Sequence, residues 1–182
     1  MFFFTYLCGY GLKNRIIIMA TITFKGGAVH TQGELPQVGA VAPDFKAVKT
    51  DLSEVSLQDF KGKKLVLNIF PSIDTGVCAT SARRFHQEVA ALDNVVIACI
   101  SKDLPFAFSR FCAAEGIDDL VMLSDFRGEF SQNYHVTFTD GPLKGLLSRC
   151  IVVIDEKGHV IHNEQVAETA NEPNYAAALA KL

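Results

Sequence analysis

The chain has 182 residues, of which 49% are hydrophobic and 20% charged, a balance typical of globular proteins and too apolar for disordered ones. Its formal net charge of −3 provides no basic surface for nucleic acid or an anionic membrane. The five cysteines are scattered singly, which fits neither a tetrahedral zinc site nor a secreted disulfide scaffold. We therefore expect one domain in a reducing compartment, the cytoplasm.

Residues 1–18 differ from the rest of the chain. The opening is apolar, but no positive charge precedes it and no small-x-small cleavage site follows it. Its apolar stretch is also shorter than the roughly 20 residues that a membrane-spanning helix needs. We expect residues 1–18, including Cys8, to be a non-native or disordered leader, and residues 19–182 to form the domain. The alternative is a weak membrane or export signal, which would place the protein in the periplasm or outside the cell.

The domain is predicted to begin with strands. Apolar and polar residues alternate on both sides of the Gly26-Gly27 pair, which predicts a hairpin over residues 21–30. A short strand is expected at residues 45–48, after a stretch interrupted by proline and glycine. Residues 63–70 are a nearly continuous apolar run, as expected for a strand that is buried on both faces.

Two helices and a second buried strand follow. From Thr75 to about Leu92, apolar residues recur at roughly helical spacing, which predicts a helix. Residues 94–101 predict a buried strand. A second helix is expected within residues 103–116, with Asp103 as its N-cap and Gly116 as its C-terminal stop.

The C-terminal third adds a hairpin. A short strand is expected at residues 120–125 and a short helix at residues 129–134. Residues 148–166 combine a β-branched run, a turn ending at Gly158 and a returning strand, and Pro173 begins a small final helix. Because strands alternate with helices before this hairpin, we predict an α/β fold, a three-layer sandwich with a mixed central sheet.

Cys78 follows the first buried strand and lies near the start of the first helix. If Thr75 is the N-cap, Cys78 is the third helical residue, and its sulfur lies near unpaired backbone N–H groups that favour a thiolate. A helix terminus contributes only about 0.3–2 kcal/mol, so catalysis would also require donors directed at the substrate. Taken by itself, Cys78 is more simply a buried thiol that packs the inner face of the helix.

The wider sequence pattern changes this interpretation. The segment PSIDTGVC matches the peroxiredoxin motif Pro-x-x-x-Thr-x-x-Cys at Pro71, Thr75 and Cys78. Over residues 20–182 the chain resembles the thiol peroxidase branch of that family, the atypical two-cysteine peroxiredoxins. TITFKGGAV, CISKDLPFAFSRFCAAEG, DGPLKGLLSRCIVVID and EPNYAAAL also carry the resemblance. It implies a thioredoxin-like fold and a thiol-specific peroxidase that reduces hydrogen peroxide and organic or lipid hydroperoxides to water and alcohols.

The resemblance also implies a role for each site residue. Cys78 would be the peroxidatic cysteine, which attacks the hydroperoxide and becomes a sulfenic acid. Thr75 would hydrogen-bond the peroxide and the sulfur, Pro71 would shield the sulfenic acid from water, and Arg149 would stabilise the thiolate and the polarising O–O bond. Cys112 would be the resolving cysteine, forming an intrasubunit disulfide with Cys78 that thioredoxin reduces. Without the resemblance, Arg149 would be a surface cation and Cys112 a core residue.

A Cys78–Cys112 disulfide requires Cα atoms within about 4.4–6.8 Å of each other. Cysteines on two separate helices do not ordinarily meet this condition, so we expect the first turn around Cys78 and the region around Cys112 to unwind. Cys99 and Cys150 lie in apolar strands and are expected to be buried and inert. The resemblance implies a homodimer, and no metal, haem or flavin cofactor.

Two other functions remain open. A thioredoxin-like disulfide oxidoreductase would carry a Cys-x-x-Cys pair, whereas the residues three positions from Cys78 are Thr75 and Ser81. A redox-sensing or chaperone-like protein that relays oxidation of Cys78 to a partner would share the first chemical step with a peroxidase. A cysteine–histidine protease is disfavoured, because His86 lies two helical turns beyond Cys78.

Overall fold

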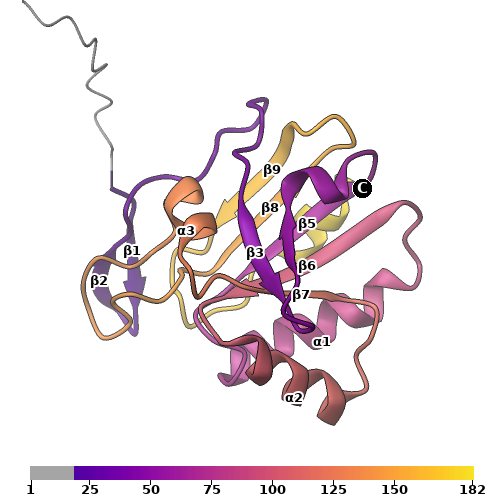
Figure 1. Ribbon diagram of the computed structural model, residues 1–182. Helices are drawn as coiled ribbons and strands as arrows, with labels where there is room; N and C mark the ends of the chain where they lie inside the picture. Colours follow the sequence, from indigo (N-terminus) through magenta and orange to yellow (C-terminus); the bar gives the residue numbers. More distant parts are fainter. Residues whose placement is uncertain (1–18) are drawn as a thin grey trace, which may run out of the picture.

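The computed structural model describes residues 19–182, and the predicted leader at residues 1–18, with Cys8, lies outside the described residues. Strands and helices alternate through much of the described chain, and the last two strands form a hairpin (Figure 1). The elements in chain order are β1 (Thr21–Phe24), β2 (Gly27–His30), β3 (Lys46–Lys49), β4 (Glu54–Ser56), the 3₁₀ helix η1 (Leu57–Phe60), β5 (Lys64–Ile69), α1 (Gly76–Val89), β6 (Val95–Ser101), α2 (Pro105–Glu115), β7 (Val121–Ser124), α3 (Glu129–Tyr134), β8 (Cys150–Ile154), β9 (Val160–Gln165) and α4 (Tyr175–Leu179).

Within the described residues, the central sheet has seven strands in the order β4-β3-β7-β6-β5-β8-β9. Strands β5, β6 and β7 are parallel to one another. On one side of this group β8 pairs antiparallel with β5, and β9 with β8; on the other side β3 pairs antiparallel with β7, and β4 with β3. Strands β1 and β2 form a separate antiparallel hairpin, with Thr21 opposite His30. The predicted mixed sheet and N-terminal hairpin are confirmed.

The two faces of the sheet are covered by different helices. Leu65 and Leu67 of β5 pack in a buried cluster with Phe130 of α3. Val66, which faces the other way, packs in a second cluster with residues of α1, α2 and α4. This alternation, expected for a strand buried on both faces, explains the continuous apolar run of β5. The predicted three-layer sandwich is therefore confirmed.

The start of α2 differs from the prediction. Leu104 is the N-cap and Pro105 is the first helical residue. Proline is favoured at this position, because the backbone N–H that it lacks would have no partner within the helix. Asp103 instead accepts hydrogen bonds from Ser72 Oγ at 2.8 Å and from the Ile73 N–H at 2.7 Å. Gly116 ends the helix in the left-handed conformation, with a φ of 67°, as predicted.

Other boundaries also differ. Helix α1 ends at Val89 rather than near Leu92. Strand β4 and the 3₁₀ helix η1 were not predicted. The strand ends at Ser56 and the helix begins at Leu57, so the periodicity changes from one residue to the next and neither pattern stands out.

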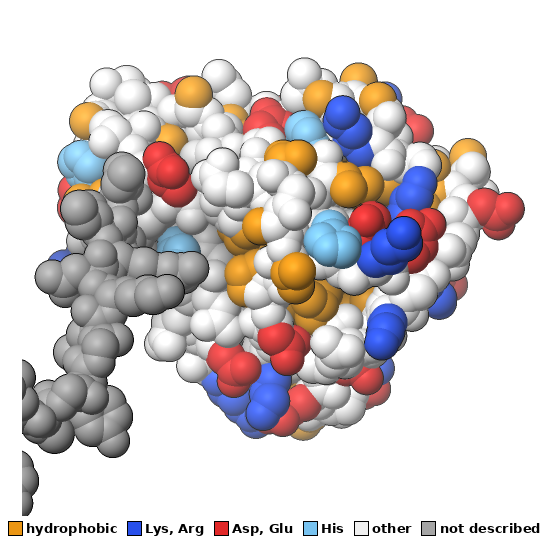
Figure 2. All heavy atoms as spheres, turned by 90° about the horizontal axis from the view of Figure 1, so that it is seen from above, with side chains coloured by type: hydrophobic (Ala, Val, Ile, Leu, Met, Phe, Trp, Pro, Cys, Tyr) orange, Lys and Arg blue, Asp and Glu red, His pale blue; other side chains and the backbone are white. Residues whose placement is uncertain are grey.

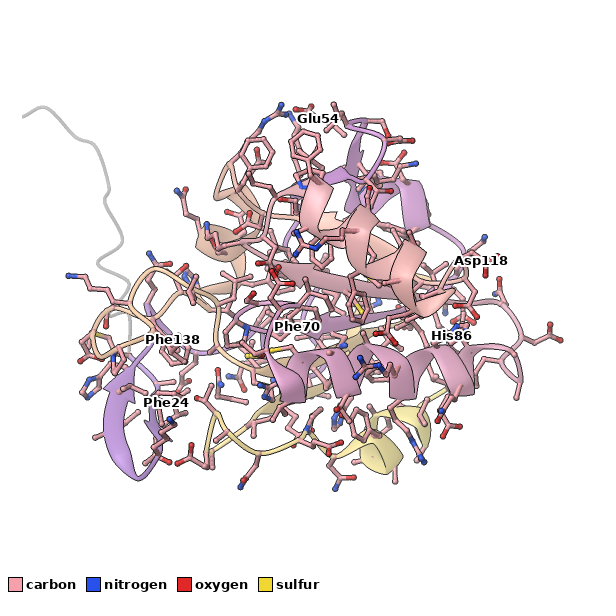
Figure 3. The ribbon with its side chains drawn as sticks, turned by 90° about the horizontal axis from the view of Figure 1, so that it is seen from below. Phe24, Glu54, Phe70, His86, Asp118 and Phe138 are labelled. Carbon is pink, nitrogen blue, oxygen red and sulfur yellow. The ribbon has the colours of Figure 1, made fainter. Side chains whose placement is uncertain are left out.

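The N-terminal hairpin is anchored to the domain by both apolar and polar contacts. Phe24 and Phe138 belong to a small cluster around buried Ile22 and Val29 (Figure 3). The carboxylate of Glu168, beyond β9, accepts hydrogen bonds from both the side chain and the backbone of the hairpin. The hairpin is therefore fastened to the segment that follows β9.

The ionised carboxylate of Glu168 stabilises the folded protein, and this contribution to the free energy of unfolding depends on pH. Backbone hydrogen bonds from Ala170 and Gly26, with others, lower the pKa of Glu168 from its usual 4.5 to about 2. Because the folded value lies below the unfolded one, this contribution is complete above about pH 4.5 and is lost as the pH falls through about 2. Melting temperatures of the wild type and Glu168→Gln should differ most near neutral pH and converge toward pH 2. A difference that did not change with pH would contradict this.

Charged side chains of both signs are interspersed on the face shown in Figure 2. Lys and Arg lie beside Asp and Glu there, in keeping with the small net charge of the sequence. Among residues 19–182, no helix combines the length and apolar character needed to cross a bilayer.

Candidate active site

Cys78 lies in the first turn of α1, the helix that follows the carboxyl end of strand β5. Thr75 is the N-cap, in an extended conformation, and Cys78 is the third helical residue, as predicted. The side chain of Cys78 is fully buried. Phe70, which follows β5, lies beside this end of α1, and His86 lies near the other end (Figure 3). The sulfur is therefore held between the helix start and the sheet.

Two donors converge on the Cys78 sulfur. Thr75 Oγ1 lies 2.8 Å from Sγ, and Arg149 Nη2 donates to it at 3.5 Å. The same hydroxyl also lies 3.1 Å from the carbonyl oxygen of Ser72. Because a hydroxyl has a single hydrogen, Thr75 can donate either to the carbonyl or to the sulfur. Donation to the sulfur is the arrangement that a thiolate requires, because a thiolate has no hydrogen to give.

Arg149 immediately precedes β8 and is only 3% exposed, so the alternative of a surface cation is wrong. Its Nε donates to the carbonyl oxygen of Thr169 at 2.9 Å, which fixes the plane of the guanidinium group. Its Nη1 is buried and, among the residues that the structure describes, has no hydrogen-bond partner. A buried donor without a protein partner is available to an oxygen atom of a bound substrate.

The loop between β5 and α1 carries Pro71, which is buried. Asp103, beyond β6, holds the two following residues, Ser72 and Ile73, and also accepts from Ser101 Oγ at 2.6 Å. This role could not be predicted from the sequence, because Asp103 lies 30 positions or more along the chain from the loop. Asp103 therefore supports the loop that leads to Thr75.

Cys112 lies in the last turn of α2 and is partly exposed. The backbone N–H groups of Gly116 and Ile117 donate to its carbonyl oxygen and close the helix. Burial raises the pKa of the Cys112 thiol. Cys112 packs against the same apolar cluster that includes Cys78, and both are free thiols.

Ion pairs join the two cysteine-bearing segments. Arg110 of α2 donates to both carboxylate oxygens of Asp74, at 2.9 and 3.0 Å. Arg83 of α1 donates to Glu115 of α2 through two bonds of 2.7 Å. The Arg83 side chain is 45% exposed and nevertheless pairs across the two helices. Arg84 pairs with Glu88 on its own helix.

Cys99 and Cys150 are fully buried, as predicted. Burial raises the pKa of each thiol to about 12, which leaves both protonated at neutral pH. Asn68 of β5 donates to Cys99 Sγ at 3.4 Å and accepts from Ser81 Oγ at 2.9 Å. The Ser81–Asn68 bond fastens the second turn of α1 to the sheet.

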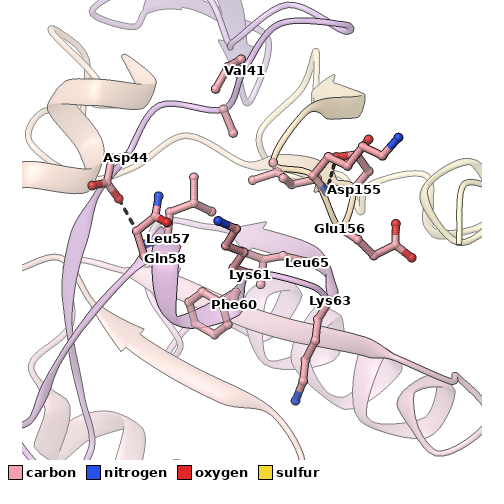
Figure 4. A pocket seen from close by; sticks show the side chains of 14 residues that line it. Val41, Asp44, Leu57, Gln58, Phe60, Lys61, Lys63, Leu65, Asp155 and Glu156 are labelled. Carbon is pink, nitrogen blue, oxygen red and sulfur yellow. Dashed lines mark hydrogen bonds between the residues drawn. The ribbon is translucent and has the colours of Figure 1, made fainter.

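A separate cavity lies at the other end of β5 (Figure 4). Leu57, Phe60 and Leu65 line it, together with Lys61 and Lys63. Strand β5 begins here and runs toward the loop that precedes Cys78. Because its lining includes no cysteine, we assign the cavity no part in thiol chemistry.

Comparison with known proteins identifies the family. The Redoxin family matches residues 37–179. The chain belongs to this family. Over 164 residues, this redoxin is 52% identical to a thiol peroxidase of Corynebacterium glutamicum and 53% identical to one of Mycobacterium tuberculosis, and each alignment covers 90% of the chain and 99% of the relative.

A solved structure supports the same assignment for this redoxin. A peroxiredoxin-like protein from Aquifex aeolicus is similar, with a TM-score of 0.85, 36% identity, and coverage of 90% of this chain and 96% of that one. The predicted membership of the thiol peroxidase branch is confirmed. The protein is a peroxiredoxin-type peroxidase, an enzyme that uses thiols to reduce peroxides.

Proposed function

We propose that Cys78 is the peroxidatic cysteine and that it reduces hydrogen peroxide and organic or lipid hydroperoxides. The observation that supports this most strongly is the convergence of Thr75 Oγ1 and Arg149 Nη2 on one buried sulfur. Both donors favour negative charge on the sulfur before it attacks. The unpartnered Nη1 of Arg149 supplies a further donor for an oxygen of the peroxide.

The first step oxidises the sulfur by two electrons. The electron pair of the Cys78 thiolate attacks the terminal oxygen of the hydroperoxide, and the O–O bond breaks. The departing oxygen takes a proton and leaves as water or an alcohol, while Cys78 becomes a sulfenic acid. Arg149 stabilises the charge that grows on the departing oxygen. Buried Pro71 shields the sulfenic acid from water.

Cys112 resolves the sulfenic acid in the second step. Its sulfur attacks Cys78, an S–S bond forms, the S–O bond breaks and water leaves. The positions of the cysteines support this step, because Cys78 lies in the first turn of α1 and Cys112 in the last turn of α2, and a helix opens more readily at its ends than in its middle. Unwinding also exposes Cys112, which removes the burial that raises its pKa.

Thioredoxin would reduce the Cys78–Cys112 disulfide by thiol–disulfide exchange. Residues 19–182 would form the catalytic domain, and the protein would act in the cytoplasm.

A homodimer is a further part of the proposal. Leu104, the N-cap of α2, Phe106 on α2, and Phe126 after β7 are exposed apolar side chains. The Ser124 hydroxyl donates to the Asp103 carbonyl and brings these two segments together. Such a surface suits contact with a second subunit.

The resolving role of Cys112 is tested with a Cys112→Ser variant. Mixed with peroxide and a thioredoxin system, this variant should oxidise once as fast as the wild type but recycle poorly, as followed by NADPH loss. Mass spectrometry should find the intrasubunit disulfide only in chains that keep Cys112. Cys150→Ser is the matched control, because Cys150 is buried and protonated. Wild-type recycling by Cys112→Ser would contradict the assignment.

The ion pair between Asp74 and Arg110 should slow disulfide formation, because it joins the two segments that must unwind. Both side chains are more than half exposed, and exposed pairs contribute about 0.2–1 kcal/mol. Arg110→Gln should therefore speed disulfide formation by up to about fivefold after a single pulse of peroxide, measured by quench-flow and mass spectrometry. Added salt should act in the same direction.

The control for Arg110→Gln is Arg84→Gln. This change removes the same charge from an exposed pair, but the Arg84–Glu88 pair lies within α1. Its rate of disulfide formation should match the wild type. Equal acceleration in both variants would show that net charge, and not the link between the helices, controls the step.

A further inference from the structure

We propose that Glu168 is a positioning residue for Arg149, and that the β1–β2 hairpin thereby supports the catalytic guanidinium group. The inference rests on the proposed roles of Cys78 and Arg149. Among the described residues, 19–182, the Glu168 side chain makes no hydrogen bond with Cys78 or Arg149. It acts through the backbone of Thr169, the neighbour whose carbonyl oxygen binds Arg149.

The carboxylate of Glu168 accepts hydrogen bonds from four donors in two segments. From the hairpin, Thr23 Oγ1 donates at 2.8 Å, and the N–H groups of Lys25 and Gly26 donate at 2.9 and 3.0 Å. From its own segment, the N–H of Ala170 donates at 3.0 Å. These bonds lower the pKa of Glu168 to about 2, so the carboxylate is ionised at neutral pH. Bonds to an ionised acceptor are the stronger kind.

Backbone bonds carry this constraint to Arg149. The N–H of Thr23 donates to the Ala167 carbonyl, and the N–H of Thr169 donates to the Thr23 carbonyl, both at 2.8 Å. The carbonyl of Thr169 then accepts from Arg149 Nε at 2.9 Å. The other side of the same guanidinium group reaches Cys78 Sγ at 3.5 Å. A displacement of residues 167–170 would therefore move the donor away from the sulfur.

The hairpin has a second polar anchor, which offers a matched control. Asp140 accepts from the backbone N–H of His30 at 2.8 Å and lies 2.6 Å from its Nδ1. This anchor joins β2 to the segment beyond Phe138 and makes no hydrogen bond with residues 167–170. Asp140→Asn thus removes a bond at the end of β2 and leaves the bonds between Thr23, Lys25, Gly26 and residues 167–170 in place.

The test compares Glu168→Gln with Asp140→Asn. The second-order rate of Cys78 oxidation by hydrogen peroxide is measured by quench-flow and mass spectrometry between about pH 5 and 9. A 1 Å misplacement of a catalytic group can lower a rate by about 100-fold, and for a partial displacement we expect a loss of about tenfold in Glu168→Gln. Its pH profile should also move to higher pH, while the later disulfide step and Asp140→Asn stay near wild type.

A double variant separates positioning from a general structural effect. If Glu168 acts through Arg149, then Glu168→Gln should slow an Arg149→Gln background little further. Thr23→Val, which removes one of the four donors, should give a smaller loss in the same direction, and it keeps the test usable if Glu168→Gln does not fold.

Three results would overturn the inference: a wild-type rate and pH profile in Glu168→Gln and Thr23→Val, equal losses in Glu168→Gln and Asp140→Asn, or full additivity with Arg149→Gln. The proposed function fails separately, if Cys78→Ser still consumes peroxide. The two failures can therefore be told apart.

Discussion

Cys78→Ser is expected to abolish thiol-dependent peroxide reduction. Serine fits the same buried space and can keep the contacts with Thr75 and Arg149, but its hydroxyl does not ionise near neutral pH. The nucleophile that breaks the O–O bond is therefore lost while the surroundings persist. The assay follows NADPH loss with a thioredoxin system and, separately, direct consumption of hydrogen peroxide by the reduced protein.

Cys99→Ser is the control for this change. Cys99 is as deeply buried as Cys78 and packs in the same apolar cluster, but its thiol, with a pKa of about 12, stays protonated. Its replacement should leave peroxidase activity near wild type. Near-wild-type turnover by Cys78→Ser would refute the assignment of the nucleophile.

Arg149→Gln should lower the rate of Cys78 oxidation by about 10²–10³, the usual effect of removing one oriented donor from a transition state. The variant loses the contact with Sγ and the unpartnered Nη1 donor. Glutamine was chosen because its amide can still donate to the Thr169 carbonyl, so that a buried acceptor is not left without a partner. The rate of the first oxidation by hydrogen peroxide is the measured quantity.

Arg84→Gln again serves as the control, because it removes a positive charge whose ion-pair partner is Glu88 of the same helix and not Cys78. A loss smaller than about threefold in Arg149→Gln would place the guanidinium group outside the oxidation step. An equal loss in the two variants would assign the effect to net charge.

The central part of the fold could be predicted because its signals are local. The apolar runs of β5 and β6 are continuous since both faces of each strand are covered. Likewise, Thr75 and Cys78 are three positions apart, which on the first turn of a helix places the hydroxyl beside the sulfur. Arg149, 71 positions beyond Cys78, was assigned only through the family resemblance.

The supporting carboxylates could not be predicted in the same way. Asp103 is of a residue type that favours the N-cap and lies near the start of α2, but its partners are Ser72 and Ile73, about 30 positions earlier. Glu168 meets donors in the hairpin more than 140 positions away. Local rules describe what a residue can do for its own helix or turn, whereas these contacts arise only after the chain has folded.

The bond between Ser81 and Asn68 sets a boundary along α1. It lies three residues beyond Cys78, and the Arg83–Glu115 pair follows two residues later. Opening of the helix up to Ser81 would release the cysteine, whereas opening beyond it would expose buried Phe85 and the rest of the apolar layer. Under the proposed mechanism, opening would therefore be confined to the residues before Ser81, and repeated cycles of oxidation would leave the rest of the fold intact.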